Sequence, residues 1–184
     1  MSSKRWEAKQ VGGPENLELV DFELKEPSAK EVSIKVLATT ATYTDLLILA
    51  GNYRPKFPLP VTPGYDLVGI VKAVGSAVTT LKTGDFVISM PQHGCMSTDV
   101  LLPEGLCVKI ESCFNAEKVV SMVLTGVTAH QMLHRVAGER ISSSSSILVH
   151  GAAGGTGSMI VQLAKLAGVL PSNIYGESCQ PPFD

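Results

Sequence analysis

A glycine-rich turn between an apolar run and a helical pattern restricts the fold of this chain more than any other feature of its sequence. Residues 147–150 are typical of a short buried strand, and Gly151-Ala-Ala-Gly-Gly-Thr-Gly157 follows at once. Apolar side chains then recur at helical spacing over residues 158–167. Such a turn lets the backbone approach a pyrophosphate, and the helix after it presents free N–H groups. We expect a strand–turn–helix unit that holds a dinucleotide; the alternative is a tight turn that needs glycine only for packing.

Within this turn, three residues occupy the fixed positions of the dinucleotide fingerprint G-x-G-x-x-G, with alanine in the first place. The match alone is weak evidence, but the strand before it and the helix after it strengthen the interpretation. The residues expected to bind the cofactor are Ala152, Gly154, Gly155, Thr156 and Gly157.

The first part of the chain has a different pattern, which indicates β structure. Alternating or apolar runs bounded by Gly and Pro predict strands at residues 17–22, 32–36, 65–74, 86–89 and 100–102. A short helix is expected at residues 45–50, where Asp45 is interpreted as a helix cap. From residue 116 to 137 the pattern is helical, with an expected break at Thr125-Gly126.

Composition excludes several classes of protein. The chain has 184 residues, of which 45% are hydrophobic and 17% charged, so intrinsic disorder is excluded. A net charge of -2 without a basic stripe argues against a nucleic-acid partner. Neither a secretory signal nor an apolar run long enough for a bilayer occurs, so no membrane partner is expected. Four cysteines without a CxxC pair predict reduced thiols and a cytoplasmic location.

Several stretches in order resemble the medium-chain dehydrogenase/reductase superfamily, and specifically its zinc-free quinone oxidoreductase branch. They are residues 61–75 (Val-Thr-Pro-Gly-Tyr-Asp-Leu-Val-Gly-Ile-Val-Lys-Ala-Val-Gly), 83–87 (Thr-Gly-Asp-Phe-Val), 124–129 (Leu-Thr-Gly-Val-Thr-Ala) and 148–157 in the glycine turn. The resemblance implies an α/β protein with a GroES-like β-barrel catalytic domain followed by a Rossmann domain that binds NADPH or NADH. It further implies an oxidoreductase acting on a small-molecule quinone, enone or carbonyl.

The resemblance also implies that this chain holds no zinc. The positions that match the zinc ligands of zinc-dependent members are Thr42 and Tyr65, and zinc prefers thiolate, imidazole and carboxylate. Cys95, Cys107 and Cys113 are too widely spaced for the structural zinc lobe of the family. His93-x-Cys95 is interpreted as ordinary loop sequence rather than as a metal site. Zinc-dependent alcohol dehydrogenase chemistry remains a distant alternative.

Without a metal, a phenol near the nicotinamide can stabilise developing negative charge or donate a proton. The resemblance places Tyr43, Tyr53 and Thr42 as candidate catalytic residues, with core packing as the alternative for each tyrosine. It places Thr128 at the nicotinamide pocket, and the alternative is a helix-interior threonine.

The length of the chain sets a second expectation. Family enzymes are about twice as long, and past residue 169 a second strand is expected, with a residue that selects NAD or NADP. Residues 170–184 instead contain three prolines and no apolar periodicity. We therefore expect a GroES-like domain at 1–122, a truncated start of a Rossmann domain at 123–169, and an irregular tail at 170–184.

Truncation would affect function in this chain. The strand at 147–150 would have both edges unpaired, and the helix after it would expose Met159, Ile160 and Leu163. We expect an impaired oxidoreductase with weak NADP or NAD binding. The alternative is a non-catalytic GroES-like remnant or splice form that binds a full-length relative, and the sequence leaves a homo- or hetero-oligomer open.

Overall fold

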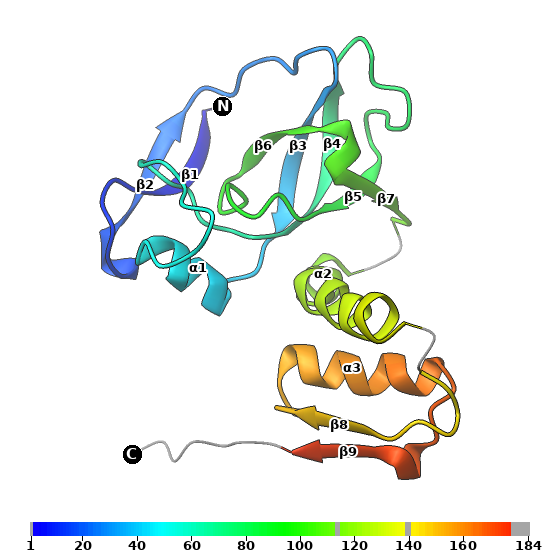
Figure 1. The fold of residues 1–184 in the computed structure, drawn as a ribbon. Helices are drawn as coiled ribbons and strands as arrows, with labels where there is room; N and C mark the ends of the chain where they lie inside the picture. Colours follow the sequence, from blue (N-terminus) through cyan, green and yellow to red (C-terminus); the bar gives the residue numbers. More distant parts are fainter. Residues whose placement is uncertain (1, 113–114, 139–140, 178–184) are drawn as a thin grey trace. The chain divides into compact units, whose positions relative to one another are not determined.

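The computed structural model describes residues 2–112, 115–138 and 141–177, which form two compact units, residues 1–123 and 124–184 (Figure 1). The division falls within the helix α2. The elements of the first unit are the strands β1 (Ser3–Ala8), β2 (Leu17–Phe22), β3 (Glu31–Ala38), β4 (Leu67–Val74), β5 (Phe86–Ser89), β6 (Asp99–Pro103) and β7 (Cys107–Ile110), the helix α1 (Tyr43–Leu49), and the 3-10 turns η1 (Pro14–Asn16) and η2 (Glu104–Leu106). The helix α2 (Ala116–His130) follows them.

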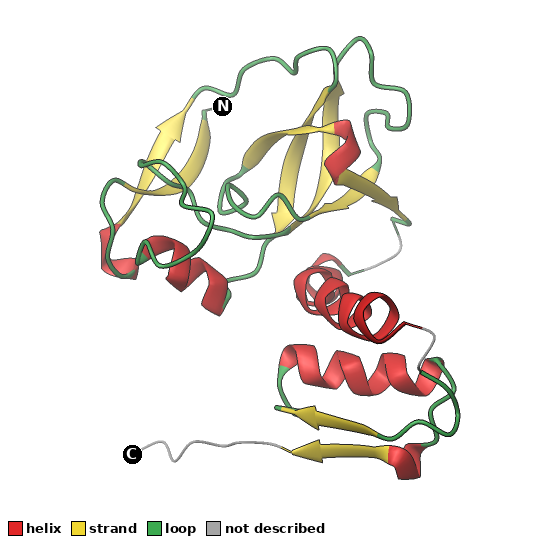
Figure 2. Cartoon of the chain, viewed as in Figure 1, coloured by secondary structure: helices red, strands yellow, loops and turns green. Residues whose placement is uncertain are grey.

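The core of the first unit is a five-stranded antiparallel sheet with the order β6-β3-β4-β5-β7, beside a separate hairpin of β1 and β2 (Figure 2). The sheet forms because its strands carry apolar residues that pack into one cluster. That cluster comprises Val32, Ile34, Leu67, Val71, Leu81, Val87, Cys95, Val100 and Leu102. The predicted β-rich domain is confirmed, while the strands β1 and β7 were not predicted from the sequence.

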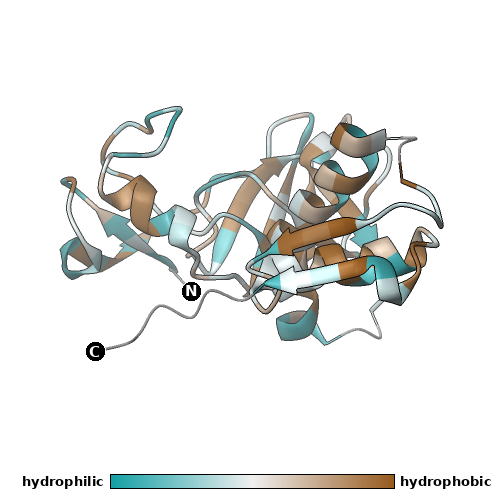
Figure 3. Ribbon diagram, turned by 60° about the horizontal axis from the view of Figure 1, so that its bottom comes forward, coloured by the Kyte–Doolittle hydropathy of each residue, from teal (hydrophilic) through white to brown (hydrophobic). Residues whose placement is uncertain are grey.

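The second unit contains η3 (Gln131–Ala137), which is a π-helix, the strand β8 (Ile147–His150), the helix α3 (Gly155–Leu166), the 3-10 turn η5 (Pro171–Asn173) and the strand β9 (Ile174–Glu177). Figure 3 shows β8 as apolar along most of its length. The two strands pair in parallel, with Ile147 opposite Ile174 and His150 opposite Glu177. This β–α–β arrangement agrees with the predicted fragment of a Rossmann fold.

Three expectations about this region are wrong. The segment at 171–177 is a turn followed by a strand rather than an irregular tail, so β8 is paired along one edge. Ile160 is buried, and Met159 and Leu163 pack against a cluster that includes Leu133. The helix does not break at Thr125-Gly126; a glycine in a helix costs only about 1 kcal/mol, and the hydrogen-bond pattern changes later, at the start of η3.

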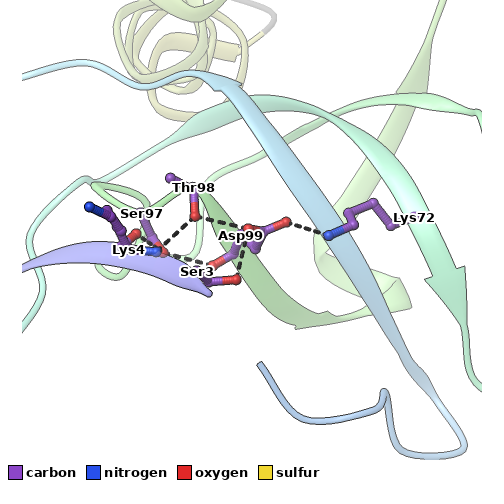
Figure 4. Close-up of polar contacts among 6 residues, drawn as sticks. All are labelled: Ser3, Lys4, Lys72, Ser97, Thr98 and Asp99. Atoms are coloured by element: carbon purple, nitrogen blue, oxygen red, sulfur yellow. Dashed lines mark hydrogen bonds and ion pairs between the residues drawn. The ribbon is translucent and has the colours of Figure 1, made fainter. Parts of the chain in front are cut away.

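A cluster of hydrogen bonds fastens the hairpin to the sheet (Figure 4). The Ser3 hydroxyl donates to Asp99 Oδ2 at 2.9 Å, and the Thr98 hydroxyl donates to the same oxygen at 2.8 Å. Lys72 Nζ binds the other carboxylate oxygen, Oδ1, at 2.8 Å. Asp99 therefore joins β1, β4 and β6 through one buried carboxylate.

Candidate functional site

The turn between β8 and α3 has a shape that only glycine permits at two of its positions. Gly151 has φ +67°, in the left-handed region, and its carbonyl accepts a hydrogen bond from the Gly154 N–H at 2.9 Å. A Cβ at Gly157 would collide with the Gly151 carbonyl and with Ala152 Cα. The N-terminus of α3 therefore lies directly against the end of β8 and carries no side-chain cap, and a helix start of this kind can bind a phosphate.

The strand β9 takes part in this turn. The Ala152 N–H donates to the Glu177 carbonyl at 3.0 Å, and a Cβ added at Gly176 would lie 2.8 Å from Ala152 Cβ. His150 Nδ1 lies 3.0 Å from Glu177 Oε2. Two stretches that are about 25 residues apart in sequence thus hold the turn together.

The six predicted cofactor residues occupy two places in the second unit. Ala152, Gly154, Gly155, Thr156 and Gly157 lie together, with Gly154 as the N-cap of α3. α3 begins at Gly155, three residues before its predicted start. Thr128 lies in α2, where its hydroxyl donates to the Leu124 carbonyl at 2.8 Å. That bond fits the helix-interior reading, and the Thr128 oxygen keeps its capacity to accept a hydrogen bond.

The candidate catalytic side of the first unit begins at α1. Thr42 is the N-cap of this helix, and Asp45 is the third helical residue of a capping box. Asp45 Oδ2 accepts hydrogen bonds from the backbone N–H and the hydroxyl of Thr42, each at 2.8 Å, and Oδ1 accepts from the Gly64 N–H at 2.8 Å. Asp45 was expected to cap the helix; it also anchors the loop that leads to Tyr65. The spacing Thr-x-x-Asp was the sequence signal for the box.

Two phenols meet beside this loop. The hydroxyls of Tyr53 and Tyr65 lie 2.9 Å apart, and either oxygen can be the donor. Tyr65 is 7% exposed, whereas Tyr53 is partly exposed. Burial, and next the hydrogen bond with Tyr53, raise the pKa of the Tyr65 phenol well above its usual range. Tyr65 therefore stays protonated at neutral pH and can donate to Tyr53.

Further aromatic rings continue from this pair. Phe57 stacks on Tyr53 with ring centroids 6.1 Å apart, and His93 contacts Phe57 at 4.4 Å. Tyr43, the third candidate catalytic residue, is 74% exposed as the first residue of α1. The structure thus brings Tyr53 together with Tyr65, which was considered only as the position of a missing zinc ligand.

The described residues contain no group of three His, Cys, Asp or Glu side chains able to hold a metal ion. Burial raises the pKa of the Cys95 thiol, and burial raises that of Cys107 to about 11. Burial thus disfavours the thiolate form of both side chains. Cys113 lies outside the described residues. None of the described helices is both long and apolar enough to span a bilayer.

The chain is similar to known proteins over most of its length. The family model of the alcohol dehydrogenase GroES-like domain matches residues 28–136. A quinone-oxidoreductase homologue of the spinach chloroplast is 34% identical over 163 residues, which cover 84% of this chain and 50% of that protein.

Two solved structures extend the comparison. The quinone oxidoreductase of Pseudomonas syringae superposes with a TM-score of 0.86 at 34% identity, covering 98% of this chain and 54% of that one. The Escherichia coli quinone oxidoreductase complexed with NADPH gives 0.82 at 27% identity, covering 96% and 53%. The chain spans about half the length of the curated relatives it matches first.

Proposed function

The chain belongs to the family of alcohol dehydrogenase GroES-like domains, and from that premise we propose that it serves the NAD(P)H-dependent, zinc-independent reduction of a quinone or enone. The predicted resemblance to medium-chain dehydrogenases/reductases is confirmed by this match. The spinach and P. syringae relatives are called quinone oxidoreductases, and the E. coli relative was solved with NADPH. These names support the substrate class and the cofactor class.

The residues of the glycine turn fit a dinucleotide. The start of α3 has no side-chain cap, and Gly157 lets the turn pack closely against the end of the strand, an arrangement that suits a pyrophosphate. When bound, the reduced nicotinamide supplies a hydride. The chain's own contribution here is to bind and orient the phosphates through Gly154, Gly155 and Thr156.

The phenol pair is the observation that carries the zinc-independent part of the proposal. Both positions that match family zinc ligands are engaged otherwise: the Thr42 hydroxyl donates to Asp45, and the Tyr65 hydroxyl pairs with that of Tyr53. The partly exposed Tyr53 can donate its proton to a carbonyl oxygen as negative charge develops there. Tyr65, held neutral by burial, then donates a hydrogen bond to Tyr53 Oη and stabilises the phenolate.

Substitution of each tyrosine tests this assignment. With a panel of quinones and NADPH, Tyr53→Phe should lower the turnover number by about 10²-fold, as expected for loss of a proton donor. Tyr65→Phe should lower it less, because the proton donor remains. Tyr175→Phe, at a 56% exposed position of β9, is the matched control and should leave turnover unchanged. Equal activity in all three variants, or stoichiometric zinc in the purified protein, would contradict the proposal.

Cofactor affinity is tested separately from turnover. We propose that the 184 residues alone bind NADPH more weakly than micromolar, the level of about -8 kcal/mol, because they span only half of their relatives. A fluorescence titration measures this directly. Tight NADPH binding by the wild type would contradict the proposed loss of affinity. Its abolition by Gly154→Val would support the glycine turn as the binding site.

The end of β9 bears on the choice of cofactor. Glu177 closes this strand, about 20 residues after the glycine turn, where an acidic side chain binds the ribose 2′-hydroxyl of NAD in β–α–β units. A carboxylate there would repel the 2′-phosphate of NADP. We therefore expect NADH to bind more tightly than NADPH, and Glu177→Ser to narrow the ratio of the two dissociation constants.

A further inference from the structure

Two imidazoles lie against each other where α2 passes into η3. His130 is the last residue of α2, and His134 is the fourth residue of η3. Their ring centroids are 4.7 Å apart and their planes are inclined by 45°. Both side chains are exposed, so water and ions reach them. Neither residue takes part in the glycine turn or the phenol pair.

The local backbone explains why the rings meet. Residues four apart in a helix lie on one face, separated by about one turn. In η3 the hydrogen bonds run from residue i to residue i+5, so each turn contains more residues than in an α-helix. Two residues that are four apart therefore lie close to one line along the helix axis. Leu133, which is 4% exposed, anchors this turn in the core of the second unit. The pair is therefore presented on a fixed stretch of backbone.

The ring separation matches the geometry of a shared metal ion. With metal–nitrogen bonds of about 2.0–2.1 Å, each ring centroid lies roughly 3.2 Å from the ion. At ligand angles of about 90–109°, two such rings have centroids about 4.5–5.2 Å apart. The observed centroid separation of 4.7 Å falls within this range, so the spacing of the two rings is compatible with one shared ion.

We propose that His130 and His134 form a bidentate site for a late first-row divalent cation, with water completing the coordination. Neutral imidazole suits Ni²⁺, Cu²⁺ and Zn²⁺, whereas Mg²⁺ requires oxygen ligands. The described residues add no third His, Cys, Asp or Glu to the pair. An ion held there links the last residue of α2 to η3 and stabilises the junction between the two kinds of helix.

Calorimetric titration of Ni²⁺ into the full 184-residue chain, without a histidine tag and with its thiols blocked, tests the site. Wild type should bind one ion per chain, and either His130→Gln or His134→Gln should weaken binding at least tenfold. Glutamine favours helices, and both positions are exposed, so these variants should keep their fold. Their circular dichroism and melting temperature without metal verify that.

The remaining histidines supply matched controls. His93→Gln and His150→Gln should change the nickel dissociation constant by less than twofold, because each side chain lies outside the pair. Affinity should rise from Co²⁺ through Ni²⁺ to Cu²⁺, and Mg²⁺ should give no heat. Added Ni²⁺ should raise the melting temperature of wild type but not of His134→Gln. Absence of nickel binding, or an equal loss in the His150→Gln control, would overturn the proposal.

Discussion

The two units of the chain differ in the kinds of side chain that they bury. Every buried polar or charged side chain among the described residues belongs to the first unit. They are Ser3, Glu7, Ser33, Asp45, Asp66, Asp85, Ser89 and Asp99. In the described part of the second unit, the buried positions are Gly157 and the apolar residues Ala129, Leu133, Val149, Ile160, Ala164 and Val169.

The buried carboxylates of the first unit connect segments that are far apart in sequence. Asp99 joins two strands to a hairpin, Asp45 joins α1 to the loop at Gly64, and Asp66 accepts hydrogen bonds from the backbone and hydroxyl of Thr40. Loops without regular structure need such partners, because a buried N–H left unpaired costs about 1–3 kcal/mol. The first unit thus adds buried charge to its apolar core, whereas the described core of the second unit is held by packing alone, and the following changes test that contrast.

The largest effect is expected from Leu133→Ala in the second unit. Removing a buried leucine side chain leaves a cavity and costs about 2–5 kcal/mol. Hydrogen exchange followed by mass spectrometry should show lost protection in η3, β8 and α3, and little change in β3 and β4. Leu148→Ala, at a 60% exposed position of β8, is the control. Uniform loss across both units would mean that they unfold as one.

A smaller loss is expected from Asp99→Asn in the first unit. The amide cannot replace the ion pair with Lys72 and accepts fewer of the hydrogen bonds from Ser3 and Thr98, so the cost should be about 1–3 kcal/mol. Urea denaturation measures it. Asp21→Asn, whose only described partner is the exposed Ser2 hydroxyl, should cost far less. If Asp99→Asn lowers the free energy of unfolding no more than Asp21→Asn does, the Asp99 carboxylate does not contribute to stability as proposed.

Acid should destabilise the first unit before the second. Burial opposes ionisation of Asp99, but hydrogen bonds from Lys72, Thr98 and Ser3 outweigh it and lower the pKa of the carboxyl. The hydrogen bond with Lys109 likewise lowers the pKa of Asp85. Groups with a depressed pKa stabilise the fold above their ordinary value, about 3.9, and this stability is lost as the pH falls through the folded-state pKa.

Exchange protection should therefore disappear from β4 and β6 at a higher pH than from α3, because the described part of the second unit buries no carboxyl. A pH series from 5 to about 2, the range in which carboxyls titrate, followed by peptide-resolved exchange, measures the order. Simultaneous loss, or earlier loss in α3, would count against the contrast between charge and packing.

The smallest effect, and a stabilising one, is expected from Gly126→Ala. An added Cβ meets no atom within 4 Å, and the backbone of α2 is helical there. Alanine should therefore add about 0.5–1 kcal/mol of helix stability. Thermal denaturation should show a slightly raised melting temperature. A lowered melting temperature would instead favour the helix break that the sequence pattern predicted at this position.

Elements with a self-contained signal were predictable. Residues 17–22, 86–89 and 147–150 were predicted with the bounds of β2, β5 and β8, because each is an alternating or apolar run between turn residues. The strand β9 was missed because Ile174 is its one strongly apolar residue and Pro171 precedes it closely. Its pairing with β8 arises from the parallel register, which no local pattern encodes.

The candidate site divides in the same way. The glycine turn is contiguous and was predicted, whereas the partnership of Tyr53 with Tyr65 depends on the course of the proline-rich loop between them. Both tyrosines were noticed, yet their spacing of 12 residues does not reveal a 2.9 Å contact. The catalytic and cofactor roles of these residues stay predictions until the variants are measured.

The Ala152 N–H donates a hydrogen bond to the Glu177 carbonyl, and Gly176 packs closely against Ala152. These two contacts set the smallest segment that could carry the nucleotide turn into another protein. An engineer who grafts only the seven residues 151–157 into another protein would lose the partner that fixes their shape. The segment to transfer is the whole stretch from Ile147 to Glu177, because contacts between its two ends fix the shape of the turn. Replacing Gly176 with a bulkier residue should disable such a graft without touching the fingerprint itself.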